Sequence, residues 1–227
     1  MLVLSLDTST RAGSAALVED GVIVHEIIGD ESRTHGERLP RDLMRLLDAA
    51  GRTLEAVDLL AVITGPGSFT GLRVGIAAVQ GLAMAAGRMI VPVSAFEALA
   101  AAAGDGTSLV GAWVDAQRGE VFASLHDADG RPMVEPSSLP PLATLERWES
   151  ALDERMLRMT GDGAVRYENV VADRLRDRAR IMPPPPFAGI AGQIAAARPD
   201  RAVLPHAIVP IYVRRSDAEL ARLRRGQ

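Results

Sequence analysis

The segment Thr64–Gly75 reads TGPGSFTGLRVG and lies between two apolar runs. The preceding run, Leu59–Ile63, is typical of a buried strand, and the following run, Ile76–Ala86, is typical of a helix. Gly65 and Gly67 allow a positive φ or the close approach of another group. Such a strand-to-helix turn can present backbone N–H groups to an anion at the helix N-terminus. It can equally be a tight turn that holds two packed elements together, so both interpretations stay open.

One supersecondary unit occurs twice along the chain. Its first copy begins with the expected strand Leu2–Asp7, and its second copy begins with Leu109–Asp115. In each copy a polar turn, a second strand, an Asp-Gly pair and a third strand follow. Asp-Gly between β-rich runs is a strong hairpin signal. The repeated order βββαβα predicts a two-lobed α/β protein, and it resembles the actin-like and Hsp70-like (ASKHA) fold, which sugar kinases share.

The glycines of the segment 104–106 mark the expected hinge between the lobes. We therefore place an N-terminal lobe at residues 1–104 and a C-terminal lobe at residues 105–227. A last helix at about 216–225 could pack back on the first lobe. Further helices are expected at Thr34–Ala50, Ser94–Ala103, Leu142–Leu152 and Phe187–Ala197, and the prolines 183–186 form a rigid spacer.

Polar residues follow the first strand of each lobe, and glycines follow a later apolar run. In the ASKHA superfamily the polar turns grip nucleotide phosphates, their acids hold a hydrated magnesium ion, and a later glycine turn approaches adenosine. Each Asp can equally cap its own turn, and each glycine cluster can be a plain loop. The candidate nucleotide-binding residues are Asp7, Thr8, Ser9, Thr10, Gly65, Gly67, Asp115, Gly161 and Gly163.

The composition excludes several chemistries. The 227 residues carry a net charge of −4, which gives no electrostatic footprint for unaided nucleic-acid binding. The absence of cysteine excludes disulfides and thiolate sites. All 25 cationic residues are arginine, so a Walker-type loop and a Schiff-base lysine are excluded. The four histidines are too dispersed for a local metal motif. The N-terminal segment is typical of a core strand and no membrane span is expected, so we expect a cytoplasmic protein.

Six segments together carry a specific resemblance to one protein family. They are Asp7–Thr10, His35–Pro40, Thr64–Gly75, Pro92–Ser94, Asp115–Val121 and Pro210–Arg214. The chain resembles, over nearly its whole length, the bacterial tRNA threonylcarbamoyladenosine (t6A) biosynthesis proteins TsaB, also called YeaZ. The glycine segment is shared with the catalytic paralogue TsaD, whereas Asp115–Val121 is more particular to TsaB.

The resemblance implies that the chain has no active site of its own. TsaD-like proteins carry Val-Asn-His-x-x-x-His, whose histidines bind the catalytic metal, where this chain has Val93–Leu99. The two histidine positions are Ala95 and Leu99, and neither side chain can ligate a cation. We therefore assign no catalytic and no metal-binding residue, and ATP or ADP with magnesium is expected only at the level of a complex.

The resemblance also implies a surface for partners. In the family, two helices of the N-terminal lobe form a four-helix interface with TsaD, or a homodimer when TsaD is missing. A TsaE-type ATPase joins the complex, and tRNA is reached only through it. The expected interface residues are Leu39, Leu43, Leu46, Leu47, Leu72, Gly75, Ala78, Val79 and Leu82.

A second hypothesis from a different class is a free-standing enzyme, either a nucleotide-dependent kinase or a metallopeptidase. A kinase needs tight ATP binding, yet the second polar turn has Ala116 and Gln117 in place of hydroxyl residues. A peptidase needs a metal or a nucleophile, and the sequence shows neither. The sequence leaves open whether the isolated chain binds nucleotide, whether it is a monomer or a homodimer, and which residues contact tRNA.

Overall fold

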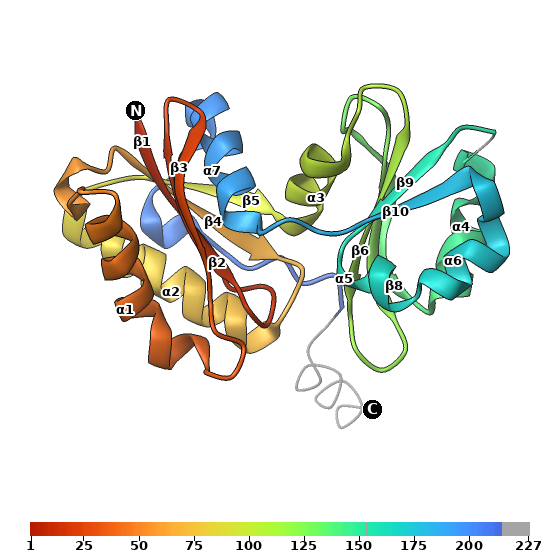
Figure 1. Ribbon diagram of the computed structural model, residues 1–227, viewed down its shortest axis with the longest axis horizontal. Helices are drawn as coiled ribbons and strands as arrows, with labels where there is room; N and C mark the ends of the chain where they lie inside the picture. Colours follow the sequence, from red (N-terminus) through yellow and green to blue (C-terminus); the bar gives the residue numbers. More distant parts are fainter. Residues whose placement is uncertain (153, 215–227) are drawn as a thin grey trace, which may run out of the picture. The chain divides into compact units, whose positions relative to one another are not determined.

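The computed structural model describes residues 1–152 and 154–214, and their contacts form two compact units (Figure 1). The first unit contains Met1–Ala102 and Pro184–Pro210, and the second contains Ala103–Pro183 and the described residues from Ile211. The first boundary lies close to the expected hinge. The expected C-terminal lobe of 105–227 is corrected, because the chain returns to the first unit at Pro184. The helix expected at 216–225 lies outside the described residues.

The first unit is built on a five-stranded sheet with the order β3-β2-β1-β4-β5. Strands β1, β4 and β5 are mutually parallel, and β2 and β3 run antiparallel as a meander. Asp20 and Gly21 both have positive φ, at 50° and 81°, which confirms the expected Asp-Gly hairpin turn. The strand bounds are β1 Leu2–Asp7, β2 Ser14–Glu19, β3 Val22–Ile28, β4 Leu59–Gly65 and β5 Ile90–Ser94.

Helices cover both faces of this sheet. Leu4 and Leu6 of β1 lie in one core cluster with apolar residues of α1 and α2. On the opposite face, Ser5 Oγ donates to the carbonyl of Ala188 at 2.6 Å, and the Ala188 amide donates to Ser14 Oγ at 3.0 Å. The sheet therefore holds α7, which comes from late in the sequence. The helical bounds are α1 His35–Ala49, η1 Leu54–Ala56, α2 Phe69–Ala86, α3 Ala95–Ala103, α7 Phe187–Ala197, η3 Pro199–Arg201 and η4 Pro205–Ala207.

The second unit repeats the topology of the first. Its sheet order is β10-β9-β6-β7-β8. On one side of β6, β7 and β8 form an antiparallel meander, and on the other side β9 and β10 run parallel to β6. Trp113 and Trp148 are fully buried in its core, with ring centroids 6.0 Å apart. The predicted ASKHA-like α/β fold with a duplicated unit is confirmed. The bounds are β6 Leu109–Asp115, β7 Val121–His126, β8 Pro132–Leu139, α4 Pro141–Leu152, β9 Leu157–Thr160, α5 Asp162–Arg166, α6 Glu168–Leu175, η2 Arg176–Arg178 and β10 Ala179–Met182.

Helix α2 is the one helix in the described part of the chain that is long and apolar enough to cross a membrane by length and composition. Its inner residues Ile76 and Val79 lie in the core beneath the sheet, and Leu72 is fully buried. Its outer side carries the exposed Arg73. A helix packed on its own sheet along one side is a core helix with an unusually apolar outer face.

Candidate functional site

The turn after β1 is organised by the carboxylate of Asp7. This side chain is 2% exposed and accepts hydrogen bonds from the Ser9 amide at 2.7 Å and the Ser9 hydroxyl at 2.5 Å. It also accepts from Thr10 Oγ1 at 3.1 Å, and Thr10 Oγ1 in turn accepts from the Gly13 amide at 3.0 Å. Asp7 therefore acts as an Asx cap of its own turn.

The glycine segment packs directly against this turn. A Cβ on Gly67 would meet the Ser9 backbone, and Cβ atoms on Gly71 and Gly75 would collide with Thr8. The Ser68 amide donates to the Ser9 carbonyl at 2.7 Å. The glycines thus allow two backbone segments to touch, which supports the interpretation of a tight turn that holds two elements together.

The six candidates of the first unit are brought together, but as a packed turn. The Ser9 amide and the hydroxyls of Ser9 and Thr10 point at Asp7, Thr8 lies against α2, and the Ser94 hydroxyl donates to the Gly65 carbonyl at 3.3 Å. Phosphate needs donors directed outward, so these donors do not fit a nucleotide phosphate as they are arranged. Nucleotide binding by these residues stays a prediction.

The candidates of the second unit also meet in one cluster. Asp115 accepts from the Gln117 amide at 3.0 Å, from Gln117 Nε2 at 2.9 Å and from Arg166 at 3.2 Å. A Cβ on Gly163 would press on the backbone of β6 at 3.0 Å, and Gly161 has φ of 106°. The Asp115 amide donates to Asp162 Oδ1 at 2.9 Å, and burial raises the pKa of the Asp162 carboxyl. The sequence reasoning missed Asp162, although it stands inside the Gly-Asp-Gly cluster.

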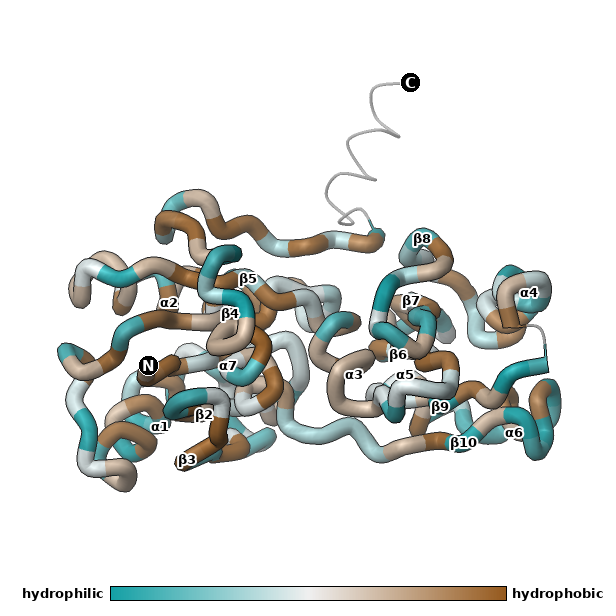
Figure 2. The backbone as a smooth tube through the Cα atoms, turned by 90° about the horizontal axis from the view of Figure 1, so that it is seen from above, coloured by the Kyte–Doolittle hydropathy of each residue, from teal (hydrophilic) through white to brown (hydrophobic). Residues whose placement is uncertain are grey.

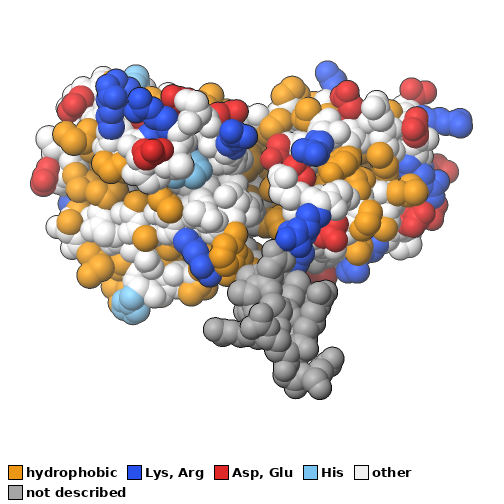
Figure 3. Space-filling model, turned by 90° about the horizontal axis from the view of Figure 1, so that it is seen from below, with side chains coloured by type: hydrophobic (Ala, Val, Ile, Leu, Met, Phe, Trp, Pro, Cys, Tyr) orange, Lys and Arg blue, Asp and Glu red, His pale blue; other side chains and the backbone are white. Residues whose placement is uncertain are grey.

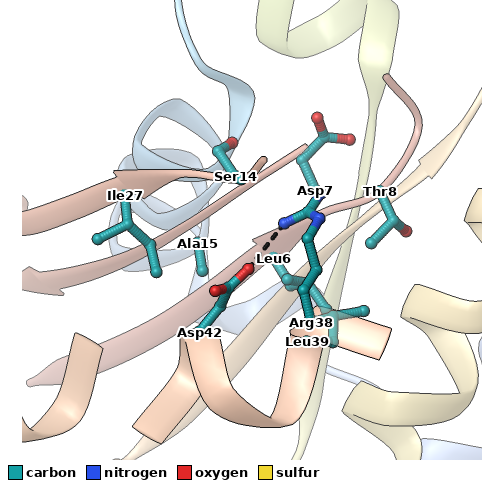
Figure 4. A pocket seen from close by; sticks show the side chains of 10 residues that line it. Leu6, Asp7, Thr8, Ser14, Ala15, Ile27, Arg38, Leu39 and Asp42 are labelled. Carbon is teal, nitrogen blue, oxygen red and sulfur yellow. Dashed lines mark hydrogen bonds and ion pairs between the residues drawn. The ribbon is translucent and has the colours of Figure 1, made fainter. Parts of the chain in front are cut away.

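A buried arginine network lies beneath the first turn (Figure 4). Arg38 of α1 is 7% exposed and pairs with Asp42 at 2.8 Å. Its other guanidinium nitrogen donates to the Ala12 carbonyl and to His35 Nδ1. His35 Nε2 donates to the Thr10 carbonyl at 3.0 Å, so Nδ1 is the unprotonated nitrogen of a neutral ring. Burial, with the adjacent Arg38, lowers the His35 pKa.

This network ties α1 to the β1–β2 turn. The recess that it closes is lined by residues including Asp7, Thr8, Arg38 and Asp42, and it has room for about one water molecule. His35–Pro40 is one of the six segments that carry the resemblance, but neither His35 nor Arg38 was given a role there. The sequence feature that could have indicated this network is the charged residue Arg38 beside Leu39 on the apolar stripe of α1. An arginine at such a position can be buried only when it is paired.

Two motifs far apart in the sequence meet in the second unit. Arg214 donates to Glu120 Oε2 at 3.1 Å and to the Ala116 carbonyl at 3.1 Å. Ser138 donates to the same Glu120 oxygen at 2.6 Å. Gln117 and Arg118, which lie between Ala116 and Glu120, both have left-handed backbone, with φ of 59° and 58°. The arginine of the Pro-x-Tyr-x-Arg motif thus clamps the turn of the Asp115–Val121 motif.

The two positions that the resemblance matches to metal-binding histidines of TsaD-like proteins are apolar and buried here. Ala95 and Leu99 of α3 are both 0% exposed. Among residues 1–152 and 154–214 there is no group of three or more His, Asp or Glu that could hold a metal ion.

The expected interface residues fall into two sets. One set is buried in the core of the first unit, so it cannot form a surface, and the prediction is corrected for these six. They are Leu39, Leu43, Leu46, Leu72, Gly75 and Val79. The other set, Leu47, Ala78 and Leu82, is half-buried beside an exposed apolar face.

The exposed face of α1 and α2 carries residues outside the expected interface set. Met44 of α1 is 64% exposed and Met84 of α2 is 74% exposed. Ala77 and Gly81 lie on the same outer side of α2, and a Cβ on Gly81 would meet nothing within 4 Å. Figure 3 shows hydrophobic side chains spread over the side of the first unit on which these helices lie. We call Met44, Ala77, Gly81 and Met84 the outer helical face.

The solved structure of YeaZ from Pseudomonas aeruginosa is similar to this chain along nearly its whole length. It is 32% identical, the match covers 93% of this chain and 99% of that chain, and the TM-score is 0.76. The chain belongs to the TsaB/YeaZ family. This TsaB/YeaZ-family chain is also 41% identical over 126 residues to TsaB of Haemophilus influenzae, a match that covers 55% of this chain and 53% of that protein. The chain thus aligns with about half the length of that curated TsaB.

Two further comparisons place this TsaB/YeaZ-family chain among related folds. The family model of TsaD, tRNA N6-adenosine threonylcarbamoyltransferase, matches residues 23–133. The activator of a 2-hydroxyisocaproyl-CoA dehydratase from Clostridium difficile is 13% identical with a TM-score of 0.52 and covers 88% of the chain, which shows a common fold alone.

Proposed function

We propose that this TsaB/YeaZ-family chain is the non-catalytic partner of a TsaD-type catalytic subunit in bacterial t6A synthesis, working with a TsaE-type ATPase. The catalytic subunit would transfer threonylcarbamoyl from its adenylate to the adenosine beside the tRNA anticodon. The observation that carries the proposal is the outer helical face, where Met44 and Met84 stand 64% and 74% exposed.

The outer helical face has the composition of a helix-docking surface. On α2, the exposed Met84 lies one turn from Gly81 and two turns from Ala77, whose small size lets another helix approach closely, and the neighbouring helix α1 exposes Met44. Contiguous exposed apolar residues on a soluble protein mark interaction sites, and methionine adapts its shape to a partner surface. The half-buried Leu47, Ala78 and Leu82 would extend the contact. Without the partner, the same face would pair two copies of this chain.

The assignment of catalysis to the partner and not to this chain is supported by two residues of α3. Buried Ala95 and Leu99 offer no ligand to a metal, so the chain would hold the catalytic subunit in its competent arrangement. Contact with tRNA, and any ATP or ADP with magnesium, belongs in this proposal to the complex. A cytoplasmic location is part of the same proposal.

Gel filtration of the chain mixed with a TsaD-type subunit tests the contact. Ala77→Glu and Met84→Glu should each abolish the heterodimer, because each buries an unpaired charge in the contact. Met133→Glu is the matched control, since Met133 is exposed on β8 of the second unit and should leave the heterodimer intact. Heterodimer formation by both α2 variants would contradict the proposed surface.

Reconstituted tRNA modification tests the role. We expect the catalytic subunit to be inactive, or nearly so, until this chain is added. Full transfer without the chain would overturn the role of activator. Turnover of ATP or of a peptide by the isolated chain would favour the free-standing enzyme instead.

A further inference from the structure

The two most exposed methionines of the chain lie on the outer helical face. All eight methionines belong to the part of the chain that the structure describes. Met84 is 74% exposed and Met44 is 64% exposed, whereas the next most exposed, Met156, is 47% exposed and Met159 is fully buried. The thioethers that solvent reaches most easily therefore lie on the surface proposed for the partner.

The surroundings of both side chains leave them open to solvent. Met44 follows the exposed Arg41 by one turn of α1 and precedes the exposed Arg45, in a helix along which hydrophilic and hydrophobic residues are interspersed (Figure 2). On α2, Met84 lies one turn from Gly81, which has no side chain to cover it. Because the oxidation of sulfur follows its exposure, a small oxidant should reach Met44 and Met84 before the other methionines.

No thiol on this chain competes for the oxidant. The sequence has no cysteine, so the sulfur chemistry of the chain is that of methionine alone, whose reversible oxidation product is the sulfoxide. Oxidation turns a flexible apolar side chain into a polar one and disrupts contacts that are rich in methionine. An oxidant should therefore change the outer helical face first.

We propose that Met44 and Met84 form an oxidation site through which a peroxide controls the attachment of the catalytic partner. The inference rests on the proposed function, because it concerns the same surface. In the forward step the thioether sulfur attacks one peroxide oxygen, an S–O bond forms, the O–O bond breaks, and hydrogen peroxide leaves as water. The sulfur is oxidised by two electrons. In the reverse step a methionine sulfoxide reductase uses two thiols, which become a disulfide, and the sulfoxide oxygen leaves as water.

The effect on binding follows from the polarity of the sulfoxide. In the free chain its oxygen is hydrated, so the fold should not change. In the contact it would be buried among the apolar surroundings of Ala77 and Gly81, and a buried polar group without a donor opposes association. Oxidation should therefore weaken binding to the partner without unfolding the chain, and it should also weaken any pairing of two copies through this face.

Hydrogen peroxide applied to the dilute purified chain tests the inference. Catalase then removes the oxidant, and peptide mass spectrometry confirms sulfoxide at residues 44 and 84. We expect the Kd for a TsaD-type subunit to rise about tenfold or more. The circular dichroism spectrum should be unchanged, and a methionine sulfoxide reductase with dithiothreitol should restore the original Kd. An unchanged Kd with both sulfoxides present would overturn the proposal.

Two double variants locate the effect. Leucine is apolar and similar in volume to methionine, so the chain with Met44→Leu and Met84→Leu should bind the subunit and keep its Kd after treatment. The matched control carries Met133→Leu and Met156→Leu, two exposed positions of the second unit, and should lose affinity like the wild type. Equal loss of affinity in the first variant would place the sensitive site elsewhere and overturn the proposal.

Protection by the partner gives a second readout. In the complex the contact excludes the oxidant, so Met44 and Met84 should be oxidised far more slowly than in the free chain. Met133 and Met156 should be oxidised at the same rate in both states. Equal oxidation of Met84 in the free and bound chain would contradict the site.

The untreated chain separates this inference from the proposed function. If the untreated chain does not bind a TsaD-type subunit, both are overturned. If treated and untreated chains bind equally well, the oxidation site alone is overturned and the proposed function stands.

Discussion

Gly75 of α2 lies so close to Thr8 of the β1–β2 turn that a Cβ on Gly75 would collide with the Thr8 hydroxyl oxygen. The contact continues toward the start of α2 and into the turn before it, because Gly71 faces the Thr8 carbonyl and Gly67 faces Ser9. Turn and helix touch backbone to backbone. The first unit is therefore sensitive to a single methyl group at this position.

We expect Gly75→Ala to destabilise the protein by about 1–3 kcal/mol, the usual cost of overpacking. Gly81→Ala is the matched control in the same helix, because a Cβ there meets nothing within 4 Å. It should stabilise by about 0.5–1 kcal/mol through helix propensity. Urea unfolding midpoints at constant m-value measure both changes. Equal shifts in the same direction would mean that Thr8 does not restrict Gly75.

The His35 network predicts a loss of stability in mild acid. The folded pKa of His35 lies below its unfolded value of about 6.5, chiefly because of burial and then because of Arg38. The unfolded chain therefore takes up the proton first, and the stability due to the neutral ring is full above pH ~6.5 and falls as the pH drops through the folded pKa.

Urea unfolding at about pH 7.5 and about pH 5.5 checks this expectation. His35→Gln should flatten the difference between the two conditions, whereas His206→Gln on the exposed turn η4 should not. A wild-type midpoint that does not change between the two conditions would contradict the neutral state of His35.

Arg176 closes α6 with φ of 49° and ψ of −128°, a conformation that suits glycine. Arg176→Gly should raise stability by about 1 kcal/mol, because relief of about 1–3 kcal/mol of strain exceeds the entropic cost of a new glycine. Asp177→Gly, one residue later and without positive φ, should lower stability. Thermal unfolding compares the pair, and a lower Tm for Arg176→Gly would show that the side chain compensates for the strain.

The first unit should be unable to fold from its N-terminal part alone. Residues 1–102 lack α7, whose removal would take away the hydrogen bonds of Ser5 and Ser14 to Ala188 and uncover one face of the sheet. We expect that fragment to show no cooperative unfolding by circular dichroism. Adding a peptide of Pro184–Pro210 should restore it, and a peptide with Gly192→Leu should not, because Val18 and Ser5 already lie against Gly192. Cooperative unfolding of the fragment alone would contradict this expectation.

The local patterns predicted most elements, and the structure confirms them. Phe187–Ala197 is helical over the expected range, and the strand and helix around Thr64–Gly75 form as expected. The assignment of α7 to a lobe failed because periodicity describes one helix and not the sheet that it meets. The signal for its position was polar: Ser5 and Ser14 interrupt otherwise apolar strands, and buried hydroxyls need a partner.

For the six buried residues, the interface prediction was wrong for a related reason. Leu39, Leu43 and Leu46 follow the helical spacing of an apolar stripe, and that stripe of an amphipathic helix faces its own core. The residues available to a partner are those off the stripe, such as Met44. An apolar residue that breaks the pattern of a surface helix is the better sign of an external contact.

The return of the chain at Pro184 also governs how the protein is made. A nascent chain usually completes its N-terminal domain while the rest is still being translated. Here both faces of the first sheet are covered only after α7 has left the ribosome. One face of that sheet therefore stays uncovered while residues 103–183 of the second unit are synthesised. During that interval the nascent chain exposes the side of the first sheet that α7 later covers, and we expect ribosome-associated chaperones to bind there.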